Sequence, residues 1–175
     1  MLIILDRDGV INEDSDDYIK NPDEWIPIPS SLAAIAALNR AGHQVAVATN
    51  QSGIARGLYT EETLQKIHDK MQRSLAAVGG HVDGIFYCPH GPDENCHCRK
   101  PKSGLLLQIA EKFHADLTKA LVVGDAARDI DSARAVGCPA VLVKTGKGMR
   151  TLAAYGDKLD VKVYDNLAAV VKDIL

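Results

Sequence analysis

Short apolar runs alternate with amphipathic stretches along the whole chain, and this alternation limits its fold more than any other feature. Strands of a parallel sheet that is covered by helices on both faces are buried, so they occur as short apolar runs. The pattern therefore predicts an α/β fold with a doubly wound, Rossmann-like parallel sheet flanked by helices. We expect strands at 2–5, 45–48, 84–87, 121–123, 140–143 and 161–164. Helices are expected at 31–41, with Ser30 or Ser31 as N-cap, at 61–77, 104–113 and 129–136, and at the C-terminus.

The length of 175 residues suits one hydrophobic core, and no repeat, low-complexity tract or flexible linker divides the chain. We therefore expect one domain, 1–175. Three irregular segments, 12–29, 52–59 and 88–103, each begin near the end of a predicted strand. Ligands bind at this edge of an open α/β sheet, and loops of this length are usually functional.

Charge and hydropathy exclude several kinds of partner. The net charge is −3, with 20 basic and 23 acidic side chains, so no basic field for nucleic acid is indicated. The apolar N-terminal run ends at Leu5, too short for a signal-peptide core or a membrane span. We expect a cytoplasmic monomer that binds neither nucleic acid nor membranes.

Two carboxylates, Asp6 and Asp8, directly follow the first predicted strand. Their side chains point to the same side if the strand continues through them. Two like charges this close resist joint ionisation unless a cation or a proton neutralises one of them. The pair therefore indicates metal binding and acid–base chemistry, although an acidic turn would have the same residues.

Polar residues also follow the second and fourth predicted strands. The run Thr49-Asn50-Gln51-Ser52 offers hydroxyl, amide and backbone N–H groups that can hold an anion, although such residues are also common in turns. Asp125 follows the fourth strand and Asp129 lies four residues later; either could instead begin the next helix.

Taken in order, these segments resemble the motifs of the haloacid dehalogenase (HAD) superfamily of phosphohydrolases, over nearly the whole chain. They are Asp-x-Asp-Gly-Val-Ile-Asn at 6–12, Thr49, Lys100 and Gly-Asp at 124–125. The resemblance implies an Mg²⁺-dependent phosphatase in which Asp6 is the nucleophile and forms an aspartyl phosphate. Asp8 would be the general acid and then the general base.

The same resemblance implies roles for the other motif residues. Mg²⁺ would be held by Asp6, the backbone carbonyl of Asp8, and Asp125. Thr49 and Lys100 would bind the oxygens of the transferred phosphoryl group. Asp129 is a secondary candidate, because a role at the start of a helix explains it equally well.

Cysteine and histidine residues cluster after the third predicted strand, as Cys88-Pro-His90 and Cys96-His97-Cys98. In a reducing compartment this density indicates a metal rather than disulfides. Tetrahedral Zn²⁺ takes such thiolate and imidazole sets, and a closed set of four protein ligands is structural. We expect Cys88, His90, Cys96 and Cys98 to be the ligands, although His97 could replace a cysteine.

Three features together restrict the resemblance to one group within this superfamily. They are the cysteine–histidine cluster, Cys-x-Cys-Arg-Lys-Pro at 96–101, and Thr-Asn-Gln-Ser-Gly-Ile-Ala-Arg-Gly at 49–57. This combination of motifs is similar to that of the heptose 1,7-bisphosphate 7-phosphatases of lipopolysaccharide-core precursor synthesis. This implies a sugar phosphate substrate, no substantial cap domain, and a zinc-stabilised loop that brings Arg99 and Lys100 to the substrate. Arg99 can bind a second anionic group bidentately. Further substrate contacts are expected from Asp14, Tyr18, Asn50, Gln51 and Ser52.

Three alternatives remain. Histidinol-phosphate phosphatases share much of the pattern. A signalling receiver also phosphorylates an aspartate in a doubly wound sheet, but usually after its third strand, whereas Asp6 follows the first. A zinc-finger nucleic-acid module is disfavoured by the acidic surroundings of the cysteines and by the lack of a basic recognition helix.

Overall fold

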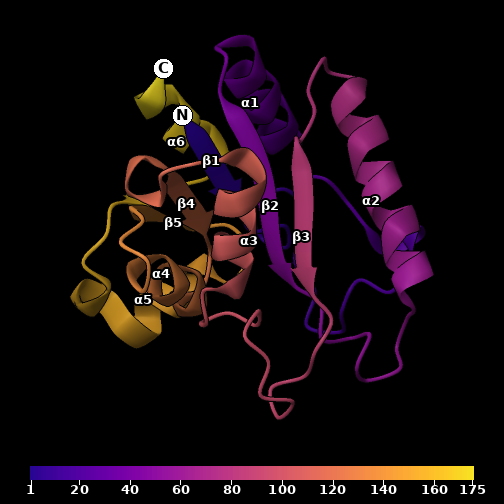
Figure 1. Ribbon diagram of the computed structural model, residues 1–175. Coiled ribbons are helices and arrows are strands. Elements are labelled where there is room, and N and C mark those ends of the chain that lie inside the picture. The colour runs from indigo at the N-terminus through magenta and orange to yellow at the C-terminus, as the bar shows by residue number, and fades with distance from the viewer.

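Six parallel strands form one sheet in the computed structural model, which describes residues 1–175 (Figure 1). Their order across the sheet is β3-β2-β1-β4-β5-β6. The doubly wound sheet predicted from the apolar runs is therefore confirmed. The strands are β1 (Leu2–Leu5), β2 (Gln44–Asn50), β3 (Gly84–Cys88), β4 (Leu121–Gly124), β5 (Ala140–Val143) and β6 (Val163–Tyr164).

Six α-helices and three short 3₁₀ turns connect the strands. No helix has the length and apolar character needed to cross a bilayer. The helices are α1 (Pro29–Arg40), α2 (Glu61–Ala76), α3 (Gly104–Phe113), α4 (Ala127–Arg134), α5 (Gly148–Tyr155) and α6 (Leu167–Ile174). The turns are η1 (Pro22–Glu24), η2 (Leu117–Lys119) and η3 (Gly156–Leu159).

The side chains of β1 alternate between two apolar layers, as the period of two residues in a strand requires. Ile3 and Leu5 belong to the core cluster that contains the buried residues of α1, α2 and α6. Leu2 and Ile4 belong to the cluster that contains those of α3. Both faces of the sheet are thus covered, which explains why every residue of β1 is apolar and buried.

Local chemistry shifts several element boundaries from the predicted ones. Helix α1 begins at Pro29 rather than being capped by Ser30 or Ser31, because the fixed φ of proline suits the first helical position. Helix α4 begins at Ala127, where the Asp129 carboxylate accepts the Ala126 N–H at 3.1 Å. Helix α5 was not expected, and the last strand is two residues shorter than predicted.

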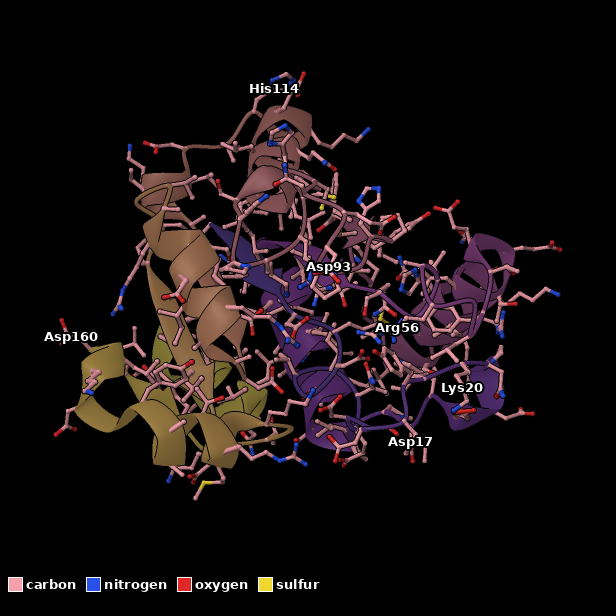
Figure 2. The ribbon with its side chains drawn as sticks, turned by 90° about the horizontal axis from the view of Figure 1, so that it is seen from below. Asp17, Lys20, Arg56, Asp93, His114 and Asp160 are labelled. Carbon is pink, nitrogen blue, oxygen red and sulfur yellow. The ribbon has the colours of Figure 1, made fainter.

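The order of the strands creates a crevice at the C-terminal ends of β1 and β4. The chain passes from β1 to β2 on one side and from β4 to β5 on the other, and ligands bind where the order reverses in this way. The loops after β1, β2 and β3 meet at this edge, at the lower end of Figure 1. Figure 2 looks onto it and labels one residue in each loop: Asp17, Arg56 and Asp93.

The loops at this edge contain little regular structure. The chain between β1 and α1 forms only η1, and the chain between β3 and α3 forms neither helix nor strand. No substantial cap domain is present, as expected. Access to the crevice is therefore shaped by these loops.

Candidate active site and metal centres

A polar cleft of about 200 Å³ lies at the crevice, and 15 of its 17 lining residues are not hydrophobic. Eleven of the residues selected from the sequence line it together, although they come from five separate segments of the chain. Asp129 is buried behind the cleft rather than on its wall. The eleven are Asp6, Asp8, Asp14, Tyr18, Thr49, Asn50, Gln51, Ser52, Arg99, Lys100 and Asp125.

Three buried carboxylates converge at the base of the cleft. Asp6, Asp125 and Asp129 each offer an oxygen, and these oxygens lie within 4.8 Å of one another. Burial and repulsion from Asp129 raise the pKa of Asp6 to about 6, although Lys100 opposes the shift. Burial and repulsion from Asp6 and Asp129 raise the pKa of Asp125 to about 8. The cluster therefore has an excess of negative charge that a divalent cation would neutralise.

The Lys100 ammonium lies between two of these carboxylates and is only 4% exposed. Its Nζ donates to Asp129 Oδ1 at 2.7 Å, to the Ala48 carbonyl at 2.8 Å and to Asp6 Oδ1 at 3.1 Å. Burial alone would lower the pKa of Lys100, but Asp129 and Asp6 outweigh it and raise the pKa. The lysine therefore remains a cation beside Asp6.

Asp8 lines the same cleft, but not because the strand continues. Strand β1 ends at Leu5, and a turn then brings Asp8 to the cleft. Arg7 Nε and Asn12 Nδ2 donate to Asp8 Oδ1 at 2.9 and 3.0 Å. Burial would raise the pKa of Asp8, but attraction to Arg7 and these hydrogen bonds outweigh it and lower the pKa. Asp8 is therefore ionised in the free site.

The side-chain amides of Asn50 and Gln51, at the C-terminal end of β2, line the cleft and also form hydrogen bonds with other residues of the protein. Asn50 Oδ1 accepts the Lys100 N–H at 3.0 Å, and its Nδ2 donates to the Lys100 carbonyl at 3.2 Å. Gln51 donates to Thr49 Oγ1 at 3.0 Å and accepts from the Tyr59 hydroxyl at 2.5 Å. Asn50 thus fixes the backbone of Lys100, and Gln51 fixes the hydroxyl of Thr49.

Several cations of the cleft were not selected from the sequence. Arg56, Arg128 and Lys147 line it beside the expected Arg99 and Lys100. Lys147 follows β5, so applying the strand-end argument to the fifth strand would have found it. Arg128 lies between Asp125 and Asp129, and Arg56 lies within the polar loop after β2. An isolated basic residue in such a loop gives no signal by itself.

Ion pairs connect the loop after β1 to the segment around the start of α5. Lys147 Nζ lies 3.6 Å from Asp14 Oδ2. Arg150 donates to both oxygens of Asp16 at 3.0 Å. On the other side of this loop, the Arg56 guanidinium lies 5.9 Å from the centre of the Tyr18 ring. Asp14 and Tyr18 are thus held at the cleft by partners distant in sequence.

The cysteine–histidine loop forms a second cluster of candidate metal ligands, Cys88, His90, Cys96 and Cys98, within 4.8 Å of one another. His90 Nδ1 lies 3.4 Å from Cys88 Sγ and 3.3 Å from Cys98 Sγ, and Cys88 Sγ lies 3.6 Å from Cys96 Sγ. Zn–S and Zn–N distances of about 2.3 and 2.0 Å give tetrahedral edges near these values. His97 is not part of the cluster.

Comparison with known proteins assigns this arrangement to a family. The HAD-hydrolase-like family model matches residues 97–170. A D-glycero-β-D-manno-heptose-1,7-bisphosphate 7-phosphatase of Pseudomonas aeruginosa is 57% identical over 176 residues, covering 99% of this chain and 97% of that protein. The chain belongs to this family of HAD phosphatases. The Bordetella bronchiseptica enzyme of the same name is 53% identical and is covered to 97%.

Solved structures agree with this assignment. The D,D-heptose 1,7-bisphosphate phosphatase of B. bronchiseptica, in complex with magnesium and phosphate, superposes with a TM-score of 0.95 at 53% identity. That alignment covers 99% of this chain and 97% of the other. The corresponding enzyme of Burkholderia thailandensis has a TM-score of 0.78 at 45% identity. The family resemblance seen in the strand-end motifs is therefore confirmed.

Gly9 and Gly42 provide a matched test of the packing around Asp125. Their φ angles are +86° and +83°, so alanine is strained equally at both, by about 1–2 kcal/mol. A methyl group on Gly9 would overlap Asp125 Oδ2, whereas none of the protein lies within 4 Å of one on Gly42. We expect Gly9→Ala to lower kcat by about 10²-fold, because small displacements of catalytic groups cost that much. Gly42→Ala should leave kcat unchanged.

Phosphate release and thermal unfolding of the two variants check this expectation. A loss of activity in Gly9→Ala that Gly42→Ala does not share supports the packing argument; Gly9→Ala should also lose more stability, because the overlap with Asp125 adds to the backbone strain. Equal activities would show that Asp125 tolerates displacement.

Proposed function

We propose that this chain hydrolyses the 7-phosphate of D-glycero-β-D-manno-heptose 1,7-bisphosphate, and so acts in the synthesis of heptose precursors for the lipopolysaccharide core. The chemistry depends on one observation: the buried Asp6 carboxylate lies beside the Lys100 ammonium and within the carboxylate cluster, at the floor of a polar cleft. The choice of substrate is supported by relatives of that name at 53–57% identity over nearly their whole length.

Asp6 is the proposed nucleophile. One of its carboxylate oxygens attacks phosphorus while the bond from phosphorus to the sugar oxygen breaks, and an aspartyl phosphate forms. Water then attacks this intermediate and releases inorganic phosphate and the free Asp6 carboxylate. Lys100 and Thr49 stabilise the charge on the phosphoryl oxygens in both steps.

Asp8 moves the proton in both steps. It protonates the leaving sugar oxygen in the first step, and in the second it takes a proton from the attacking water. The ionised form present in the free site is the one that the second step needs. A bound phosphate group adds negative charge beside Asp8 and favours the protonated form that the first step needs.

The residues at the floor of the cleft fit Mg²⁺. Asp6 and Asp125 offer carboxylate oxygens whose pKa values are raised by burial and by neighbouring carboxylates, and no hydrogen bond from the protein occupies the Asp8 carbonyl oxygen. Oxygen ligands of this kind, with sites left for water and phosphate, suit magnesium. When bound, the ion would neutralise charge on the phosphate and on Asp6.

The cleft also suits a substrate with a second phosphate. Arg99, Arg56 and Lys147 line it in addition to the groups assigned to the reaction. Arg99 belongs to the cysteine–histidine loop, where its Nη1 lies 3.5 Å from the His90 carbonyl. Asp14, Tyr18, Asn50, Gln51 and Ser52 would contact the sugar or its phosphates. We propose that the enzyme works as a cytoplasmic monomer on this small substrate, without nucleic acid or membrane.

Phosphate release in the presence of Mg²⁺, compared between the heptose bisphosphate and histidinol phosphate, tests the substrate. We expect kcat/KM to be at least about 10³-fold higher for the heptose, because histidinol phosphate has a single phosphate and leaves the additional cations unpaired. A higher kcat/KM for histidinol phosphate would identify histidinol phosphate as the substrate and leave the proposed mechanism unchanged. Release from neither would leave the substrate unidentified.

Asp6→Asn tests the nucleophile. An amide of the same shape cannot form the acyl phosphate, so we expect kcat to fall by about 10⁴-fold or more while the fold is retained. The exposed Asp23 in η1 provides a control, and Asp23→Asn should retain full activity. Turnover of Asp6→Asn at the normal rate would exclude Asp6 as the nucleophile.

We further propose that Cys88, His90, Cys96 and Cys98 hold one structural Zn²⁺. The set is closed, with four protein ligands and none left for water, as in structural rather than catalytic zinc sites. A metal there would fix the loop between β3 and α3 that leads directly into Arg99 and Lys100. Its contribution would thus be to the position of these two cations.

Metal analysis of the purified protein should find about one zinc per chain. We expect Cys96→Ser to lose the zinc and lower the melting temperature, because metal binding is coupled to folding of the loop. Cys138 is buried and is not one of the four clustered residues, so Cys138→Ser controls for the loss of a thiol and should retain the metal. Carefully prepared wild-type protein that lacks zinc would contradict the proposal.

A further inference from the structure

Arg7 is a charged side chain with no exposed surface, and neither it nor its partner His68 lines the cleft. Its guanidinium forms side-chain hydrogen bonds with only two residues. Nε donates to Asp8 Oδ1 at 2.9 Å, and Nη1 lies 3.1 Å from Nε2 of His68. Arg7 therefore connects Asp8 to a histidine 61 positions later in the sequence.

His68 is suited to accept the hydrogen bond from Arg7. It lies on the buried face of α2 and is 3% exposed. Burial and the neighbouring Arg7 cation lower its pKa to about 3, so the ring is neutral at physiological pH. Since Arg7 has only donors, Nε2 of the neutral ring is the acceptor.

The contacts of the Asp8 carboxylate show that Arg7, which His68 contacts, controls its orientation. Two donors, Arg7 Nε and Asn12 Nδ2, form hydrogen bonds with Oδ1, and Arg7 Nη2 lies 2.8 Å from it as an ion pair without hydrogen-bond geometry. The other oxygen, Oδ2, has only a long contact of 3.5 Å to Gln51 Nε2. Oδ1 is thus held by the protein, and Oδ2 is left for proton transfer. The orientation of the carboxylate depends on the orientation of the Arg7 guanidinium.

We propose that His68 is a positioning residue for the reaction, acting through Arg7 to orient the Asp8 carboxylate for proton transfer to the leaving group. The inference rests on the proposed role of Asp8 as general acid. Without the acceptor on α2, one end of the buried guanidinium has no partner and reorients. Asp8 then loses the fixed geometry that proton transfer requires.

Two substitutions separate this role from packing. His68→Leu keeps an apolar side chain of similar size but removes the acceptor. His68→Gln keeps an acceptor oxygen at a similar reach. We expect kcat/KM for the heptose bisphosphate to fall about tenfold or more in His68→Leu and to stay within about threefold of wild type in His68→Gln.

The leaving group provides a readout that packing alone does not affect. The sugar alkoxide needs a proton when it leaves, whereas p-nitrophenolate leaves without one. Since kcat/KM covers only the steps up to release of the leaving group, His68→Leu should be impaired on the heptose bisphosphate but nearly normal on p-nitrophenyl phosphate. Asp8→Asn should show the same selectivity more strongly. Met71→Ala, another buried position on α2, controls for loss of stability and should show no selectivity.

A selective loss in His68→Leu that His68→Gln restores supports the inference. Unchanged activity of His68→Leu, or an equal loss on both substrates, overturns it while leaving the proposed function intact. If Asp8→Asn itself shows no selectivity, Asp8 is not the general acid, and both its proposed role and the inference fail.

Discussion

The burial of Lys100 among oxygen atoms at the floor of the cleft is the interaction on which the rest of the site depends. Its ammonium contacts Asp6 and Asp129 and the carbonyl of Ala48 at the end of β2. Removing either partner of a buried ion pair leaves an unpaired charge in a medium of low polarity, which is strongly destabilising. Lys100 therefore balances charge in the fold as well as facing Asp6, the proposed nucleophile. Lys100 and the neighbouring Arg128 carry two positive charges against three buried carboxylates, so the cluster keeps a negative charge that the proposed Mg²⁺ would neutralise.

The position of Lys100 depends on the last residue of β2, on the cysteine–histidine loop and on α4. Asn50 forms two hydrogen bonds with its backbone, and the cysteine–histidine loop ends immediately before it. The sequence is compatible with either a catalytic role or a role at the start of a helix for Asp129. In the structure, its carboxylate accepts a hydrogen bond at the start of α4 and also forms an ion pair. Its Oδ2 accepts the N–H before α4, and its Oδ1 pairs with Lys100. A single carboxylate thus couples the start of α4 to the charge beside Asp6.

The fold and the floor of the site could be predicted because their signals are local in sequence. Each buried strand is an apolar run, and the residues next to its end must lie at the ligand-binding edge, so Asp6, Thr49 and Asp125 follow from the pattern. The four residues of the cysteine–histidine cluster also lie within eleven positions of one another.

Contacts between distant segments could not be predicted. The partner of Arg7 is 61 positions away, and the partner of Asp16 is 134 positions away. Nothing near either residue in the sequence identifies its partner. Helix α5 was missed for a different reason: it begins at Gly148, shortly after Gly146, and glycines usually indicate a turn.

The cleft has no cap domain, and its loops are fixed instead by separate cross-links. Ion pairs to Lys147 and Arg150 hold the loop after β1, and the proposed zinc site would hold the loop after β3. The exposed Asp16–Arg150 pair contributes little to global stability, because solvent screens it, but it limits where the loop can lie. The strand ends therefore place Asp6, Thr49 and Asp125, whereas the loops place Asp8 and Lys100 and define the space for the substrate. Substitution of Asp16 or Arg150 should change KM more than kcat, because their exposed ion pair contacts neither the carboxylate cluster nor Lys100.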